Sequence, residues 1–234
     1  IYRRSITGTK WTRVGSVSSS KDSFTDTSVK SKNGNYVYTV KAINKNGTAS
    51  RYLYYGLICL FAKTPTMKSI AVAYNNAIEI KWNSTSSKAK YNIMRKEGDG
   101  SWKTIKSNYS GTSYRDTSVK SGKRYTYSVK AVLSTSYGKA TSSYYANSDK
   151  AITYLEAPYI EDVSAVENGV KIKWQAVDGS VSYSVFRKPF DGSTGWKSIA
   201  VVLPDACEYV DTTASLTDGE YLYSIRSNAA TNKG

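Results

Sequence analysis

Hydrophobic and polar residues alternate with a period of two along much of the chain. In residues 77–82 two isoleucines and Trp82 alternate with Glu79 and Lys81, and residues 124–132 alternate in the same way. A period of two is that of a β-strand, whereas an amphipathic helix has a period near 3.6. Strands with one apolar and one polar face are typical of antiparallel sheets that cover one side of a core. The pattern therefore predicts an all-β protein.

The same series of strands and turns recurs about every 90–95 residues. Equivalent positions hold the same residue types, namely Asp26, Asp116 and Asp211, then Tyr38, Tyr127 and Tyr223, and the basic segments YRR (2–4), MRK (94–96) and FRK (186–188). This period is too long for solenoid repeats of roughly 20–50 residues, and it matches the size of a small β domain. We therefore expect a row of similar modules rather than one large domain.

Prolines mark the entries to the second and third repeats, at Pro65 and Pro158. The predicted modules are 1–63, which lacks its first strands, 64–157, which is complete, and 158–234, which lacks its last strand. Each junction is short and contains one proline, which favours a semi-stiff connection.

Each repeat holds about seven short strands, which predicts a sandwich of two sheets. The predicted core residues are Trp82, Trp174, Tyr127, Tyr223, Val129 and Ile225. A pair of tyrosines two residues apart also recurs, at 36/38, 125/127 and 221/223. We expect one ring of each pair to lie in the core with its hydroxyl bonded to the backbone, as in a tyrosine corner.

The repeats resemble fibronectin type III domains, in the variety common on surface proteins of Gram-positive bacteria. The residues that carry the resemblance are IKW (80–82 and 172–174), YNIMRK (91–96), YSVFRK (183–188), GSWKTI (100–105) and GWKSIA (195–200). The resemblance covers nearly the whole chain. It implies tandem antiparallel β-sandwiches of the fibronectin type III or immunoglobulin-like class, with incomplete first and last modules. It implies little about function, because one fold serves many functions.

The first repeat begins at its YRR segment, so the two strands that precede this segment in the other repeats are absent from it. Such a module would expose a sheet edge and half of a core. Three explanations stay open. The 234 residues are a piece of a longer protein, which we favour; or a strand from another molecule completes the module by β-augmentation; or the first module is a smaller sandwich.

The composition excludes several classes of function. The chain has no His, which excludes catalysis and zinc binding that depend on imidazole, and Cys59 and Cys207 occupy non-equivalent places, which argues against a disulfide framework. The net charge is +15, but Lys and Arg are spread singly along the strands, as on a solvated surface. Attraction to an anionic cell-wall polymer stays open. Because the charges do not cluster, we expect no nucleic-acid binding. We also expect no membrane insertion, since no apolar run reaches about 18 residues.

Few residues are candidates for a site. We expect the recurring aspartates to accept backbone N–H bonds in a turn. Trp11, Trp102 and Trp196 follow the same turn in each repeat and are the candidate ligand-binding residues, since an exposed indole can stack on a sugar or contact a protein. The alternative is that each ring lies over the edge of its sandwich. We expect no catalytic, cofactor-binding or metal-binding residues.

The sequence therefore predicts a non-catalytic extracellular segment, on the cell surface or secreted. It would serve as a spacer or adhesion segment of a bacterial surface protein, through contacts with other proteins or with cell-wall or host glycans. The alternative is a set of carbohydrate-binding modules accessory to a secreted glycan-active enzyme, which exposed coplanar aromatic rings would favour. A pocket holding two carboxylates about 5–10 Å apart would instead indicate an enzyme.

Overall fold

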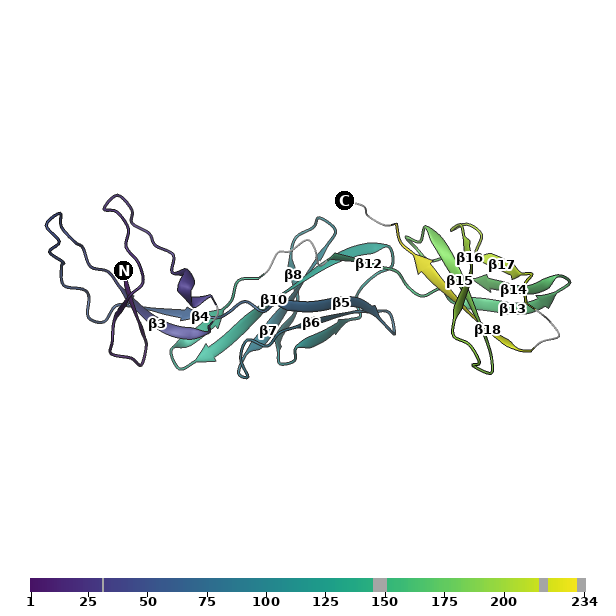
Figure 1. Cartoon of the computed structure of the whole chain (residues 1–234), viewed down its shortest axis with the longest axis horizontal. Helices are drawn as coiled ribbons and strands as arrows, with labels where there is room; N and C mark the ends of the chain where they lie inside the picture. Colours follow the sequence, from purple (N-terminus) through teal and green to yellow (C-terminus); the bar gives the residue numbers. More distant parts are fainter. Residues whose placement is uncertain (31, 145–150, 215–218, 231–234) are drawn as a thin grey trace.

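The computed structural model describes residues 1–30, 32–144, 151–214 and 219–230. Within these residues the chain forms strands β1–β18 and one short 3₁₀ helix, η1 (Thr27–Val29). The strands form three groups that follow one another along a line (Figure 1). We call these groups the first, second and third modules. The molecule is an all-β array of antiparallel sheets, as the period of two predicts.

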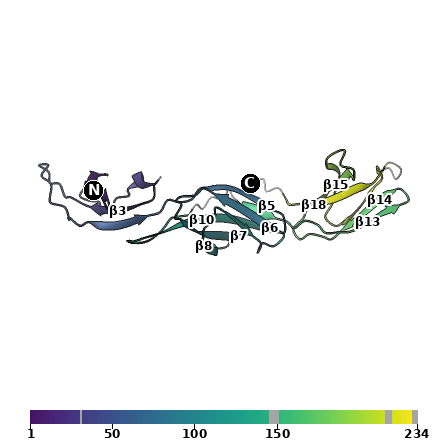
Figure 2. The same ribbon diagram turned by 90° about the horizontal axis from the view of Figure 1, so that it is seen from below.

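The first module consists of a single antiparallel sheet. Its strands are β1 (Tyr2–Ser5), β2 (Thr12–Arg13), β3 (Gly34–Thr39) and β4 (Leu57–Phe61), in the order β2-β1-β3-β4. Figure 2 shows this sheet as one layer, with loops and η1 beside it. Within the described residues no second sheet faces it. In this part of the chain the first module is therefore one sheet and not two.

The second module is a complete two-sheet sandwich. One sheet is formed by β5 (Met67–Ala73), β6 (Ala77–Trp82) and β9 (Ser113–Asp116). The other is formed by β7 (Lys90–Glu97), β8 (Lys103–Tyr109), β10 (Lys123–Thr135), β11 (Gly138–Thr141) and β12 (Ala151–Tyr154). The two sheets enclose the core of this module.

Strand β10 explains why the second module has more strands than the seven expected. It runs for 13 residues, and its first part pairs with β12 while its last part pairs with β11. The described part of the module therefore has one strand more than a seven-stranded sandwich. The β5–β6 hairpin turns at Asn75 and Asn76, which both have positive φ (57° and 48°). Two such residues in a row match the twist of a hairpin, and asparagine tolerates them well.

The third module is a smaller sandwich with three strands in each described sheet. One sheet contains β13 (Ile160–Val166), β14 (Gly169–Trp174) and β17 (Glu208–Asp211). The other contains β15 (Ser182–Pro189), β16 (Lys197–Val202) and β18 (Tyr221–Asn228). The described residues contain no counterparts of β11 and β12.

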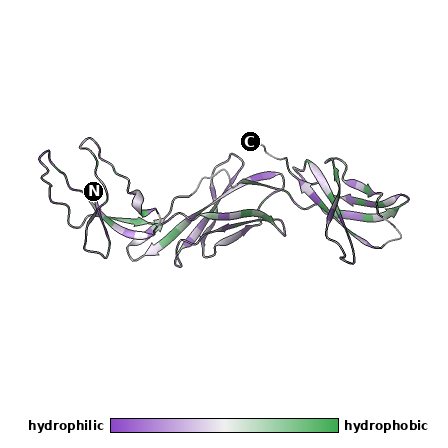
Figure 3. Ribbon diagram, viewed as in Figure 1, coloured by the Kyte–Doolittle hydropathy of each residue, from purple (hydrophilic) through white to green (hydrophobic). Residues whose placement is uncertain are grey.

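The cores of the second and third modules lie where the sequence predicts them. Hydrophobic and hydrophilic residues alternate along their strands (Figure 3). The predicted core residues that are buried are Trp82, Tyr127, Val129, Trp174 and Ile225. Tyr223 is different, because it is only partly buried and packs against the edge of the third core. In both modules the indole of the second strand packs edge-on against a tyrosine of the following strand, as Trp82 does against Tyr91.

Candidate functional site

An ion-paired cluster in the second module ties its two sheets together. Asp116 lies at the end of β9, and its side chain is only 2% exposed. Its Oδ2 accepts hydrogen bonds from Arg95 Nη1 on β7 and from the hydroxyl of Tyr127 on β10, both at 2.7 Å. Its Oδ1 accepts bonds from the backbone N–H of Ser118 at 3.0 Å and from the Ser118 hydroxyl at 2.7 Å. Four donors therefore occupy one carboxylate.

The same cluster forms in the other two modules. Its members are Arg3, Asp26, Ser28 and Tyr38 in the first module and Arg187, Asp211, Thr213 and Tyr223 in the third. The Arg–Asp distances are 2.5 and 2.6 Å. In each module the guanidinium also lies over the ring of the tyrosine two residues before the hydroxyl donor, 4.7–5.0 Å from its centroid. The repeat therefore preserves a five-residue arrangement.

The electrostatics of the cluster are those of a fixed ion pair. Burial by itself would raise the pKa of Asp116, but the hydrogen bonds from Ser118, Tyr127 and Arg95 outweigh it and lower the pKa below its ordinary value of 3.8. Burial, followed by the bond to Asp116, raises the pKa of Tyr127. The same causes raise the pKa of Tyr38 to about 12 beside Asp26. The aspartates stay charged and the tyrosines neutral near pH 7.

The cluster is an anchor, because its carboxylate has no free oxygen aimed at a substrate. The expectation that the recurring aspartates accept backbone N–H bonds in a turn is confirmed. The expectation that one buried ring of each tyrosine pair bonds the backbone is confirmed in the second module, where Tyr125 is buried and its hydroxyl accepts the N–H of Lys120 at 2.9 Å. In the first and third modules the bonded hydroxyls of the pairs, those of Tyr38 and Tyr223, donate to the aspartate.

The arginine is the member that sequence reasoning missed. It recurs at positions 3, 95 and 187, at the same period as the aspartate and the tyrosine. On an alternating strand a charged residue is expected to point to solvent, so alternation alone does not predict that this arginine binds the aspartate. The shared period was the signal that could have identified it.

The three candidate tryptophans lie in three different modules, so the structure does not bring them together (Figure 1). Trp102 is partly buried and packs edge-on against Tyr144, with ring centroids 5.4 Å apart. Trp196 is 48% exposed, and the ammonium of Lys188 lies 5.1 Å from its ring centroid. Trp196 is therefore the most accessible of the three rings.

Trp11 belongs to a small aromatic cluster on the first module. It is partly buried and packs edge-on against Tyr52 at 5.5 Å, and Tyr52 in turn lies near Tyr2. Cations cover these rings, since Arg4 lies 5.1 Å from the Trp11 ring and Lys41 lies 4.5 Å from the Tyr52 ring. Cation–π contacts of this kind fix the rings in place and leave no open stacking face on that side.

Direct contacts join the second and third modules. The Ser121 hydroxyl donates to the carbonyl of Asp178 at 2.8 Å, and the Ser227 hydroxyl donates to the carbonyl of Glu156 at 2.7 Å. Between these bonds the turns at Gly122 and Gly179 touch backbone to backbone. A Cβ on Gly179 would lie 2.3 Å from Gly122 Cα, so this approach requires glycine.

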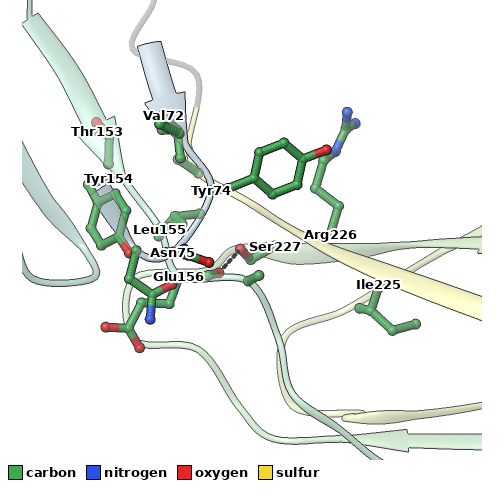
Figure 4. Close-up of a pocket in the computed structure, with 14 residues that line it drawn as sticks. Val72, Tyr74, Asn75, Thr153, Tyr154, Leu155, Glu156, Ile225, Arg226 and Ser227 are labelled. Carbon is green, nitrogen blue, oxygen red and sulfur yellow. Dashed lines mark hydrogen bonds between the residues drawn. The ribbon is translucent and has the colours of Figure 1, made fainter. Parts of the chain in front are cut away.

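A cavity of about 520 Å³ lies beside this junction, between the turn 74–76, the linker 153–157 and the end of β18. Figure 4 shows Tyr74 and Arg226 on one side of it and the carboxylate of Glu156 on the other. The walls are mostly apolar, and Glu156 is the single acid among the lining residues. The cavity therefore lacks the pair of carboxylates that glycoside hydrolysis requires.

The first and second modules are joined by one asparagine and a shared apolar contact. Asn33 Nδ2 donates to the carbonyl of Thr85 at 2.6 Å, and Asn33 Oδ1 accepts the N–H of Lys63 at 2.7 Å. Ala62 is buried in the core of the second module, and Leu60 packs against the same core. The last strand of the first module therefore leads directly into the second sandwich.

Other kinds of site were sought in the described residues. No group of three or more His, Cys, Asp or Glu side chains among them could hold a metal ion. Over the same residues no helix is long and apolar enough to cross a membrane. Cys59 is a free, exposed cysteine, and Cys207 is free and partly buried.

Comparisons with known proteins find matches among solved structures. No family model matches the chain, and no curated protein matches it. Among solved structures, the chicken CNTN1 FN1–FN3 domains are 13% identical with a TM-score of 0.31, over 84% of this chain and 72% of that chain. A two-domain fibronectin type III segment from chicken tenascin is 14% identical with a TM-score of 0.35, over 71% of this chain and 100% of that chain. At such scores the likeness carries no argument, and the tandem β-sandwich fold rests on the sheets themselves.

Proposed function

We propose that the chain is a non-catalytic spacer and adhesion segment of an extracellular, bacterial surface or secreted protein. Its modules hold distant parts of a larger assembly apart and contact other proteins or cell-wall or host glycans. The contacted junction between the second and third modules is the observation that carries this proposal. A spacer that holds two parts of an assembly at a fixed distance needs stiff modules, and each module must be fixed to its neighbour.

Two features of the chain support the spacer role. Every module carries the same Asp–Arg–Tyr anchor, which stiffens each unit in the same way. The junction adds two hydrogen bonds and a glycine contact that a freely jointed linker would lack. Interfaces between domains of one chain otherwise permit relative motion by default.

The distance between the second and third modules tests this role. Spin labels are attached at Lys106→Cys and Lys197→Cys, two exposed positions, in a chain that also carries Cys59→Ser and Cys207→Ser. Pulsed electron resonance then measures the distribution of label distances. We expect one narrow distribution for this chain and a clearly broader one after Gly179→Ala, because the added methyl group separates the two turns.

A second glycine provides the matched control. Gly192 has a φ of +73°, close to the +78° of Gly179, but a Cβ there would meet nothing within 4 Å. Gly192→Ala therefore imposes similar backbone strain within the third module and should leave the distance distribution unchanged. A broad distribution in the parent chain would contradict the spacer role.

The alternative function, carbohydrate binding beside a secreted glycan-active enzyme, is favoured by one observation. Trp196 exposes about half of its surface, and the Lys188 ammonium lies over one face of its ring, which leaves the opposite face for stacking. An indole face next to a cation can stack on a sugar and bond its hydroxyls or acidic groups. The edge-on packing of Trp11 and Trp102 limits this alternative to the third module.

A glycan-binding screen of the full chain separates the two functions. Carbohydrate binding predicts a bound glycan that is lost with Trp196→Ala and retained with Phe190→Ala, which removes another exposed aromatic ring of the same module. No binding to any glycan in the screen would reject this alternative and leave the spacer role untouched.

A further inference from the structure

The apolar face of the first module is open, whereas the equivalent face of each other module is covered. Equivalent positions of the repeat are held by Val40, which directly follows β3, by Val129 on β10 and by Ile225 on β18. Val129 is 1% exposed and Ile225 is 6% exposed, but Val40 is 63% exposed. Burial of an aliphatic side chain away from water stabilises a fold. The first module thus has an aliphatic residue at a core position, but that residue is exposed.

The open face has the shape of a groove. A cavity of about 580 Å³ lies on it, and its apolar lining includes Ile1, Phe24, Val29, Val40, Cys59 and Phe61. Several of these residues have buried counterparts in the second module. Ile93, equivalent to Ile1, and Tyr154, equivalent to Phe61, are almost fully buried there. The lining is therefore that of a core surface and not of a solvated one.

The other modules show what covers such a face. In the second module β6 pairs with β9, with Ile78 opposite Asp116 and Ile80 opposite Tyr114, and β5 pairs with β6. In the third module β14 pairs with β17 in the same way. The segment equivalent to β9 in the first module is 23–26, and within the described residues it pairs with no strand. Its backbone is a free edge that can accept one.

We propose that the open face of the first module binds a β-hairpin with the pattern of Met67–Trp82. Such a hairpin has two short strands, inward-facing aliphatic side chains on both and a tryptophan near its end. The free edge at 23–26 would pair with its second strand, and the aliphatic side chains would fill the groove beside Val40. Two hairpins of this kind lie in the described residues, β5–β6 and β13–β14, and both are already paired within their own modules.

Cys59 reports directly on this groove. It lies on β4 opposite Tyr36, it is exposed, and it lines the cavity. Its equivalent in the second module, Ile152, packs against the covered core. A hairpin seated on the face would therefore shield the Cys59 thiol, while Cys207 in the third module serves as a control in the same molecule.

The test uses the full chain and a synthetic peptide of residues 67–82, MKSIAVAYNNAIEIKW. The rates at which Cys59 and Cys207 react with an alkylating reagent are measured by mass spectrometry. We expect saturating peptide to slow the Cys59 reaction about tenfold or more and to leave Cys207 unchanged, since protection follows the population of the open face. A peptide carrying Ile78→Asp and Ile80→Asp should protect neither thiol.

An isolated hairpin is only marginally stable in water, so a covalent form provides the second measurement. A copy of residues 67–92 is joined directly before Ile1, which places a hairpin at the position that β5–β6 holds relative to Ile93 and gives it a millimolar effective concentration. The joined hairpin should protect Cys59, and its Ile78→Asp, Ile80→Asp form should not. The proposal is overturned if neither peptide nor joined hairpin protects Cys59. It is also overturned if the parent chain protects Cys59 in a concentration-dependent way, because a second copy would then cover the face.

Discussion

The first and second modules contain the same anchor but differ in what surrounds it. Asp26 and Asp116 each accept bonds from an arginine, a tyrosine hydroxyl and a serine two residues on. In the described residues a second sheet covers the apolar face behind the anchor in the second module and not in the first. The anchor therefore forms from the strands that both modules share, whereas the dry core requires the additional hairpin. In this repeat the ion-paired cluster can therefore form without the buried core.

The largest difference between the two modules should follow loss of the aspartate. Asp116→Ala leaves the partly buried Arg95 and the buried Tyr127 without their partner, which should lower the free energy of unfolding of the second module by about 3 kcal/mol. Asp26→Ala should cost the first module about 1 kcal/mol, because the aspartate and the tyrosine of its cluster are better hydrated than Asp116 and Tyr127. Hydrogen exchange measured by mass spectrometry follows β10 and β3 separately.

Asp191 provides a control for these two variants. It lies in an exposed turn of the third module and accepts the N–H of Ser193, its neighbour in that turn. Asp191→Ala should leave the exchange of β3 and β10 unchanged. Equal costs for Asp26→Ala and Asp116→Ala would show that the second sheet adds nothing to the anchor.

The next difference concerns a single pair of valines. Val129→Ala removes two methyl groups from a packed core and should cost about 2 kcal/mol. Val40→Ala removes the same groups from an exposed position and should change stability by less than about 0.5 kcal/mol. Chemical denaturation of the two variants, followed by module-resolved exchange, makes the comparison. A large cost at Val40 would mean that its face is covered in solution.

The smallest expected effect is the dependence of stability on pH. The folded pKa of Asp116 is below 3.8, so its contribution is present above that pH and is lost as the pH falls through the lower folded value. The pKa of Tyr127 is raised above 10.0, so its contribution is present below pH 10 and is lost as the pH rises through the higher folded value. Thermal unfolding should therefore show a plateau between about pH 4 and pH 10.

A variant identifies the source of this profile. Tyr127→Phe keeps the ring and removes the hydroxyl that donates to Asp116. It should reduce the alkaline fall, to which Tyr38 and Tyr223 still contribute, and leave an acid fall, because Arg95 and Ser118 still bind the carboxylate. If the loss of stability at alkaline pH were unchanged in this variant, groups other than Tyr127 would cause it.

Much of the fold could be predicted from the sequence because its signals are local. The alternation around Trp82 indicates the strand and its buried face, and the Asn75-Asn76 pair indicates the hairpin turn. The repeat period then predicts the same strands and turns in the other modules, since the same sequence signals recur there. The boundaries of the predicted modules at 63/64 and 157/158 stay predictions, although β4 and β12 end shortly before them.

The contacts that were missed join residues far apart in the sequence. Gly122 and Gly179 lie in separate turns, and nothing near either glycine predicts that their backbones touch. The edge-on contact of Trp102 with Tyr144 likewise depends on how the chain returns after β11. Alternation tells which face a side chain takes but not which partner it meets. The candidate tryptophans could therefore be located from the sequence, while their exposure could not.

Hydrogen exchange of the unmodified chain tests the central claim most directly, which is that the first module has an anchor without a covered core. The amides of β3 and β10 are compared in one experiment at one pH. The account predicts strong protection along β10 at 125–128 and markedly weaker protection in the equivalent residues 36–39 of β3, because one face of the first sheet is open. Equal protection of the two segments would contradict it.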